Sequence, residues 1–285
     1  MTPRERFVEL NRLQHHVIEW GEGDEVVVLC HGFLDFGFSF VRVAERLAAA
    51  GFRVVAFDFR GHGETEWIGR GGYYHFPDYT LDLEALVRSL DVDRVHLVGH
   101  SMGGTVASMY AGIRPERIRS LVLCEGMGPM PTDPASIPAR FATWMDGVDR
   151  VRRRERRPMA TLAEAAERLR TSHPELDDEL ALFLAEKGTR AVEGGYVFRF
   201  DPLHQTTAPV PFRLEVYTTF LGRIAAETLL LVGSRGYRLP DEDARLAHVP
   251  RAEKRVIEDV GHMVHWFRAA EMAEAIAGWA ARADR

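Results

Sequence analysis

Hydrophobic residues along the chain form short continuous runs that alternate with amphipathic segments. The runs are too short for helices and have no polar face, which is typical of strands covered on both faces of a parallel sheet. This alternation predicts an α/β fold with a doubly wound, mostly parallel sheet and right-handed crossovers. Strands are expected at residues 13–20, 26–30, 52–57, 95–98, 118–124, 228–233 and 254–258, and helices at 39–50, 80–90, 105–111, 241–247 and 269–281.

The alternation stops between residues 127 and 211. Prolines are frequent in this segment, and no strong strand pattern occurs before residues 196–200. We therefore expect an inserted helical cap at 127–211, between core segments 1–126 and 212–285.

Two helices are expected inside this cap. Thr161 and Glu164 have the spacing of a capping box that opens the first helix, and the second helix is expected from Pro174 to Gly188. The apolar side chains of the cap have two open interpretations, which are the lining of an apolar acyl or aryl pocket and the cap's own small core. These residues are Phe141, Trp144, Met145, Phe183, Tyr196 and Phe198.

The strand at 95–98 runs directly into Gly99-His100-Ser101-Met102-Gly103, and a helix follows. A serine between two glycines at a strand-to-helix turn is the sequence form of a nucleophile elbow. The glycines lack a Cβ and allow close chain passage, while the helix behind Ser101 directs free N–H groups at nearby negative charge. The alternative is a tight turn that carries a serine by chance, which does not explain the partner residues below.

Composition narrows the function classes only mildly. The formal net charge of −6 argues against nucleic acid as the main partner. No run of 18 apolar residues and no secretory signal is visible, so no membrane partner is expected. Cys30 and Cys124 lie in apolar runs and are expected to be buried thiols of a cytoplasmic protein. Six arginines within 150–157 indicate a solvated surface, with a site for an anionic partner as the alternative.

Several motifs together resemble the α/β-hydrolase superfamily over nearly the full chain. The closest resemblance is to its serine hydrolase-like, esterase- or lipase-type branch. The superfamily supports many chemistries, so the fold alone does not fix a substrate. The motifs, in family order, are His31-Gly32, Asp58-x-Arg60-Gly61-His62-Gly63, Gly99-x-Ser101-x-Gly103 and Gly261-His262.

The resemblance implies a role for several of these residues. Ser101 would be the nucleophile, and His262 the base that takes its proton, with His265 as the second choice. The oxyanion hole would consist of the backbone N–H groups of Phe33 and Met102. His31 and His62, beside glycines in turns, are expected to be structural or pocket-lining residues.

The acid that orients the histidine departs from the commonest family pattern. That acid usually follows the late strand in a Gly-x-x-Asp context, but here Gly233 is followed at the third position by Gly236. Glu125 ends the strand after the elbow helix, on the sheet edge where active sites lie. Its placement resembles that of the acid in haloalkane dehalogenases. We therefore predict Glu125 as the acid, with Asp241 or Asp243 as the alternative.

These residues predict a serine hydrolase that cleaves a small ester through a Ser-His-Glu triad and an acyl-enzyme. The expected partner is a small ester with an apolar acyl or aryl group, and a homodimer is left open. No metal or organic cofactor is expected. Serine at the elbow argues against haloalkane dehalogenase or epoxide hydrolase activity. Thioesterase, lactonase and carbon–carbon bond hydrolase chemistry remain alternatives, as does a lid-gated binding protein with little turnover.

Overall fold

The protein, as described by a computed structural model of residues 2–283, is built on an eight-stranded sheet. The strand order is β1-β2-β4-β3-β5-β6-β9-β10, with β1 and β2 antiparallel to their neighbours and the remaining strands parallel. This arrangement confirms the predicted doubly wound, mostly parallel sheet. The strands are β1 (Arg4–Leu10), β2 (Leu13–Trp20), β3 (Val26–Cys30), β4 (Arg53–Phe57), β5 (Val95–His100), β6 (Ile118–Cys124), β9 (Glu227–Gly233) and β10 (Ala252–Ile257).

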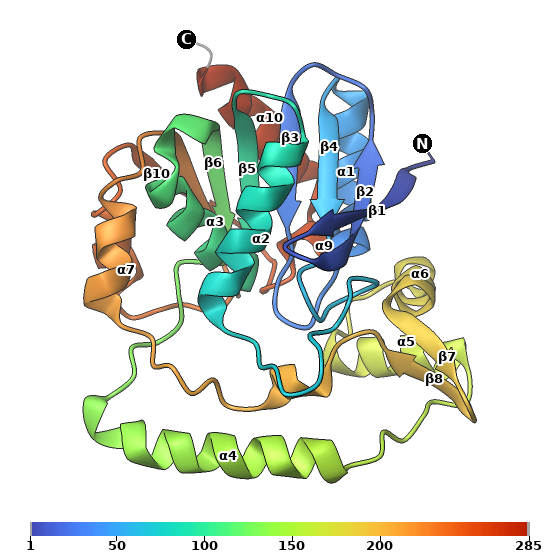
Figure 1. Ribbon diagram of the computed structural model, residues 1–285. Helices are drawn as coiled ribbons and strands as arrows, with labels where there is room; N and C mark the ends of the chain where they lie inside the picture. The colour runs from blue at the N-terminus through green and yellow to red at the C-terminus, as the bar shows by residue number, and fades with distance from the viewer. Residues whose placement is uncertain (1, 284–285) are drawn as a thin grey trace.

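Helices cover both faces of the sheet (Figure 1). On one face the core lies under α2, α3 and α7, and on the other under α1, α9 and α10. Alternate residues of a strand enter opposite cores, so Val28 faces α2 and α3 while Val27 and Leu29 face α1 and α10. The helices are α1 (Val41–Ala49), α2 (Phe76–Ser89), α3 (Met102–Ile113), α7 (Leu214–Leu221), α8 (Glu242–Leu246), α9 (Val264–Phe267) and α10 (Ala269–Ala283).

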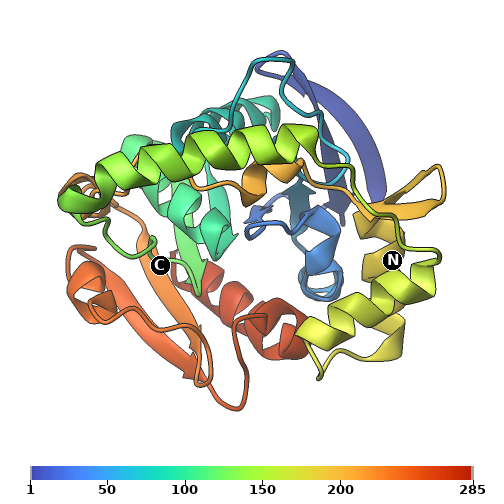
Figure 2. The ribbon, with the colours of Figure 1, turned by 90° about the horizontal axis from the view of Figure 1, so that it is seen from below.

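The segment expected to be a cap, residues 127–211, lies between β6 and β9, which are neighbours in the sheet. It covers the carboxyl ends of the parallel strands (Figures 1 and 2). Its α5 and α6 pack together over a small apolar core that includes Leu180 and Trp266. Its elements are α4 (Ile137–Arg153), α5 (Leu162–Ser172), α6 (Asp178–Gly188), β7 (Thr189–Val192) and β8 (Gly195–Phe198).

The expected helix starts are partly right. Thr161 is the N-cap of α5 and its side chain accepts the N–H of Glu164 at 3.1 Å. The carboxylate of Glu164 reaches the N–H of Ala160 instead of Thr161, so the capping box is shifted by one residue. The second helix, α6, begins at Asp178, because Asp177 provides its side-chain cap.

Elements outside the sequence expectations include β1, β7, α4 and α7. The 17-residue α4 has no fully buried residue, and its half-buried row, at 137, 140, 144, 147, 148 and 151, includes Arg140 and Gly147, so the apolar stripe in its sequence is weak. Pro138 lies in its first turn, where proline favours a helix start instead of breaking the helix. The same effect moves the start of α2 forward to Phe76, since Pro77 lies in that first turn.

The arginine-rich stretch ends α4 and continues into an exposed loop. Arg153 pairs with Asp149 on the helix surface, as expected for a solvated run. Arg156 differs, because its guanidinium donates to the carbonyls of Phe198 and Phe200 and lies over the Phe200 ring. Within residues 2–283, no helix has the length and apolar character that a membrane crossing needs.

Candidate active site

Ser101 occupies the turn between β5 and α3 with φ 51° and ψ −115°. A positive φ strains the backbone of a non-glycine residue, and such strained residues cluster at functional sites. The Ser101 N–H donates to the carbonyl of Cys124 at 2.9 Å, which ties the turn to β6. A Cβ on Gly103 would lie 2.3 Å from the carbonyl oxygen of Cys30, and one on Gly126 would lie 2.4 Å from that of Ser101. The glycines therefore permit the close packing that holds the serine.

Glu125 follows β6 directly and directs its carboxylate at His262. Oε2 of Glu125 lies 3.1 Å from Nδ1 of His262 and also accepts the N–H of Tyr237 at 3.1 Å. Oε1 accepts the N–H of Gly233 at 2.6 Å. The Glu125 side chain is 0% exposed, whereas the His262 side chain is 35% exposed. The carboxylate is therefore fixed by several donors, and Nε2 of the imidazole is the nitrogen left for other partners.

The lack of a side chain at Gly236 leaves room for the Glu125 carboxylate, which extends from the end of β6 to His262. A Cβ on Gly236 would lie only 2.2 Å from Oε1 of Glu125, so the two side chains would compete for one space. The two alternative acids lie elsewhere. Asp241 pairs with the buried Arg245, and Asp243 pairs with Lys254 on the surface.

The two residues predicted to donate to an oxyanion are close to Ser101 along the chain or in space: Met102 follows it directly, and Phe33 follows Gly32, where a Cβ would lie 3.4 Å from Cβ of Ser101. Met102 is the first residue of α3, so its N–H has no partner inside the helix. The Phe33 N–H has no backbone acceptor within the described chain. The Phe33 ring is 51% exposed and, with the Met102 side chain, lines the same cavity as Ser101 and His262.

We call this space of about 720 Å³ the Ser101 cavity. Its walls come from the β5–α3 turn, the start of α2, the first part of the cap and the segment that leads back to the core. Most of the wall is aromatic or apolar. Its lining residues are Phe33, Tyr73, Tyr74, Phe76, Tyr79, Ser101, Met102, Thr105, Glu125, Gly126, Gly128, Pro129, Met130, Thr132, Arg140, Leu203, His204, Thr206, Ala208, Phe212, Tyr237 and His262.

The six apolar cap residues considered for a pocket lining are absent from that wall. Phe141 and Met145 are 40% and 57% exposed on α4, so they form no core either. Phe183, Tyr196 and Phe198 pack against the small core of the cap, as the alternative interpretation expected. The remaining residue of the six, Trp144, contacts the rings of Tyr73 and Phe141. The tyrosines before α2 and the residues around His204, which carried no recognised pattern, form the wall instead.

His31 and His62 are buried histidines outside the Ser101 cavity. Nε2 of His31 accepts the N–H of Phe59 at 2.9 Å, and its Nδ1 donates to the carbonyl of Gly32 at 2.7 Å. Burial lowers the pKa of His31, and that of His62 even further. Both rings are therefore neutral structural groups.

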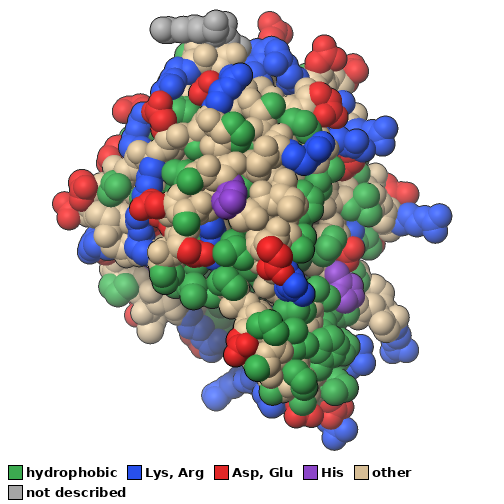
Figure 3. Space-filling view, turned by 90° about the vertical axis from the view of Figure 1, so that its left-hand side faces the viewer, with side chains coloured by type: hydrophobic (Ala, Val, Ile, Leu, Met, Phe, Trp, Pro, Cys, Tyr) green, Lys and Arg blue, Asp and Glu red, His purple; other side chains and the backbone are tan. Residues whose placement is uncertain are grey.

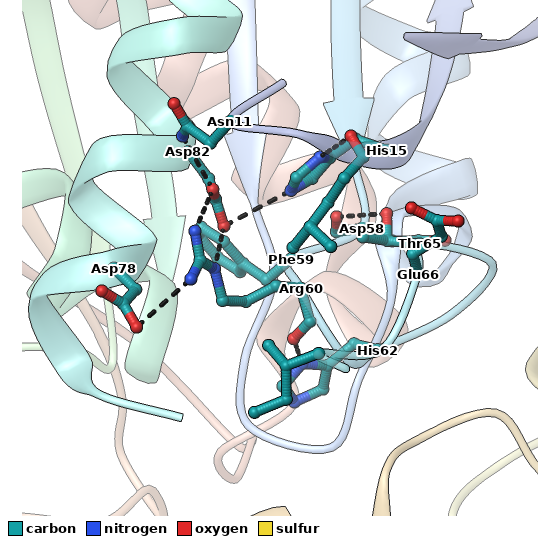
Figure 4. A network of polar contacts seen from close by, with 12 residues as sticks. Asn11, His15, Asp58, Phe59, Arg60, His62, Thr65, Glu66, Asp78 and Asp82 are labelled. Carbon is teal, nitrogen blue, oxygen red and sulfur yellow. Dashed lines mark hydrogen bonds and ion pairs between the residues drawn. The ribbon is translucent and has the colours of Figure 1, made fainter. Parts of the chain in front are cut away.

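Arg60 anchors the loop after β4 through a network of polar contacts (Figure 4). Its guanidinium donates to both carboxylate oxygens of Asp82, at 2.7 and 2.6 Å, and pairs with Asp78 at 3.2 Å. Asn11 and His15 also reach Asp82, at 3.0 and 3.3 Å. The network joins β4, α2 and the first two strands, so this motif residue has a structural function.

His265, the second choice for the base, is fully buried behind the site. Its Nε2 lies 3.4 Å from both Asp35 and Ser39, and it does not line the Ser101 cavity. The neighbouring His100 donates its Nε2–H to the carbonyl of His262, 2.9 Å away. Burial, together with His265 and His262, lowers the pKa of His100 far below its ordinary value. Of the two candidates for the base, His262 and not His265 therefore lines the Ser101 cavity.

Comparison with known proteins gives consistent similarities. The family model described as the alpha/beta hydrolase fold matches residues 25–269. A serine hydrolase-like protein of Danio rerio is 31% identical over 233 residues, covering 78% of this chain and 70% of that protein. A 2-hydroxy-6-oxononadienedioate/2-hydroxy-6-oxononatrienedioate hydrolase of Cupriavidus pinatubonensis is 29% identical, covering 88% and 85%. The solved thioesterase domain from the curacin biosynthetic pathway superposes with a TM-score of 0.89 at 28% identity, covering 98% and 100%.

Proposed function

Since the chain belongs to the alpha/beta hydrolase fold family, we propose that it is a serine hydrolase that cleaves small esters. The observation that carries the proposal is the 3.1 Å contact between Glu125 and Nδ1 of His262, at the edge of the cavity that holds Ser101. Activation of a serine requires a base that a third group orients, and this arrangement supplies both.

The proposed first step is acyl transfer to the enzyme. With Nδ1–H donated to Glu125, the free Nε2 of His262 accepts the proton of Ser101 as Oγ attacks the ester carbonyl. The N–H groups of Phe33 and Met102 donate to the oxyanion that forms. His262 then protonates the departing alcohol, and the carbon–oxygen bond breaks to leave an acyl-enzyme.

The second step releases the acid. Water enters where the alcohol left, and His262 takes its proton as the oxygen attacks the acyl carbonyl. Collapse of the second tetrahedral intermediate returns that proton to Oγ of Ser101. The atoms and protons of the two steps are all supplied by the protein, the ester and one water molecule.

Thioester cleavage is the second candidate, and it would use the same two steps. The full-length similarity to a thioesterase domain supports including it. Lactone and carbon–carbon bond cleavage are further alternatives within the same site, and the similarity to a hydrolase of the latter kind supports testing it. A binding protein without turnover is the rival from another class.

Ser101→Ala tests the proposal against a panel of aryl esters and thioesters graded by acyl length. We expect steady turnover by the natural chain and a loss of at least about 10³-fold in the variant, since loss of the serine removes covalent catalysis. A fluorophosphonate probe should label Ser101. Ser234→Ala, which changes an exposed serine, is the control and should retain activity. A single slow burst without turnover, or labelling at another residue, would overturn the assignment.

A further inference from the structure

Arg140 on α4 is the one lysine or arginine that lines the Ser101 cavity within the described chain. Its Nε donates to the carbonyl of Ala208 at 2.6 Å, which fixes the guanidinium against the opposite wall. Its two terminal nitrogens make no hydrogen bond or ion pair among residues 2–283. A cation is therefore held in place with most of its donors unused.

The cavity contains no carboxylate that could neutralise this cation. Glu125 is the single acidic residue of the lining, and its oxygens are already taken by His262, Gly233 and Tyr237. The nearby His204 adds no charge, because burial lowers its pKa to about 3. Arg140 thus creates an unbalanced positive charge in a largely apolar cavity.

Arg140 lies where the Ser101 cavity continues into a second space of about 320 Å³, which we call the apolar extension. Both spaces have Tyr74, Phe76, Pro129, Arg140, Ala208 and Phe212 in their walls. The extension does not include Ser101 and passes under α4 toward α7. On the side that carries α7, hydrophobic side chains gather over the lower part of the surface (Figure 3), and exposed Val210 and Val216 belong to the extension. Arg140 therefore lies at the part of the Ser101 cavity that the extension shares, whereas Ser101 does not border the extension.

A third cavity bears on the orientation of an ester in the site, that is, on whether its acyl part or its alcohol part faces Arg140. This cavity of about 420 Å³ borders His262 and Phe33 but not Ser101, and lies toward α5 and α6. In the proposed function His262 protonates the departing group, which must therefore lie beside its imidazole. If the departing group occupies this space, the Ser101 cavity and its extension are left for the acyl part, which then extends toward Arg140.

We propose that Arg140 forms an anion subsite that selects substrates with a carboxylate or another oxyanion on the acyl chain, several bonds from the reacting carbonyl. A guanidinium pairs with such a group through two parallel hydrogen bonds, which are strong where water is partly excluded. Thr132 lies in the wall of the same cavity and adds a hydroxyl group to its lining. This inference rests on the proposed function and narrows its substrate class.

The test compares aryl monoesters of adipic and suberic acids with neutral aryl alkanoates of equal chain length. We expect the natural chain to prefer an anionic ester, and Arg140→Gln to lose about 10- to 100-fold in kcat/KM on that ester while changing little on its neutral partner. Arg140→Lys keeps the charge and should retain part of the preference. Arg153→Gln is the matched control, since Arg153 lies on the same helix, pairs with Asp149 and lines none of these three spaces.

Equal losses on both esters in Arg140→Gln, or no preference in the natural chain, would overturn the anion subsite while leaving ester hydrolysis intact. Absence of any turnover that depends on Ser101 would instead overturn the proposed function. In that case calorimetric binding of the same esters to Ser101→Ala, with and without Arg140→Gln, still decides the inference. Weaker binding of the anionic ester alone supports it, and unchanged binding refutes it.

Discussion

At the residue scale, the position of Glu125 could be predicted because two sequence facts point the same way. Gly236 offers no side chain at the place where the family usually has its acid, and Glu125 ends a strand at the correct edge. The structure adds the reason the two are linked, since a Cβ at Gly236 would collide with Oε1 of Glu125. Arg140 could not be predicted in this way, because no motif or strand end marks its position in the sequence.

Glu125→Gln should reduce kcat by about 10³- to 10⁴-fold, as removal of the orienting acid does in well-studied triads. The amide that replaces the carboxylate presents a donor to groups that are already donors, so the His262 ring loses its orientation. Steady-state kinetics on one aryl ester measures the effect.

Asp241→Asn and Asp243→Asn are the controls for that experiment. Both carboxylates are occupied by Arg245 and Lys254, away from His262, so kcat should stay within about threefold in each. The opposite ranking of Glu125→Gln and these two variants would make one of the later aspartates the acid.

At the scale of elements, sequence prediction succeeds where burial imposes a pattern. The parallel strands appear as continuous apolar runs because both of their faces are covered, and most of their ends agree with the structure. By contrast, β1 is an edge strand and α4 is a surface helix, and both have only half-buried positions where the other elements have buried ones, apart from Leu10 at the end of β1. Arginines occupy half-buried positions in both, Arg6 in β1 and Arg140 in α4, so the apolar pattern in the sequence is weak.

Asp58 shows how one buried carboxylate joins several elements. It accepts the N–H groups of Gly37 at 2.6 Å and Glu64 at 2.8 Å, and pairs with Nδ1 of His16 at 2.9 Å. Burial alone would raise the pKa of Asp58, but the hydrogen bond and charge of His16 lower it below 3.8. Burial likewise opposes the charged form of His16, yet its bond to Asp58 raises the pKa above 6.5.

Asp58→Asn should lower the free energy of unfolding near neutral pH by about 3 kcal/mol, because it breaks a buried ion pair. A carboxylate with a lowered native pKa stabilises the fold above its unfolded pKa, and this contribution is lost as pH falls through the native value. The difference between natural chain and variant should therefore shrink below about pH 4. Urea unfolding across pH measures it. Asp24→Asn, at an exposed position, should show no such difference, and a gap that persists in acid would contradict the argument.

At the scale of the whole molecule, the sheet and the cap differ in how firmly they are held. Both faces of the sheet bury continuous apolar cores, whereas α4 buries no residue and ends in the arginine-rich loop. In the view from below, α4 runs across the face of the molecule as a single helix (Figure 2). Segments with little buried area open locally at low free energy.

Brief trypsin treatment should therefore cleave first within residues 150–154, before any site in the core. Mass spectrometry of the early fragments identifies the cut. Changing the arginines at 150, 152, 153 and 154 to glutamine should slow the first cleavage by about tenfold or more, because the remaining sites need larger openings. Early cleavage inside β3 to β6 would show instead that the core is the weaker part.

The placement of the cap between β6 and β9 also divides the chain into two parts that can evolve separately. Every residue proposed for the bond-breaking steps lies outside the insert, at Phe33, Ser101, Met102 and Glu125 before it and His262 after it. Arg140 and most of the wall opposite Ser101 belong to the insert or to its return. A recombination that exchanges residues 127–211 between two relatives would therefore change the substrate selectivity and leave the catalytic residues unchanged. Among descendants of such an exchange, the substrate range would change with the insert, while the reaction type would be inherited with the core.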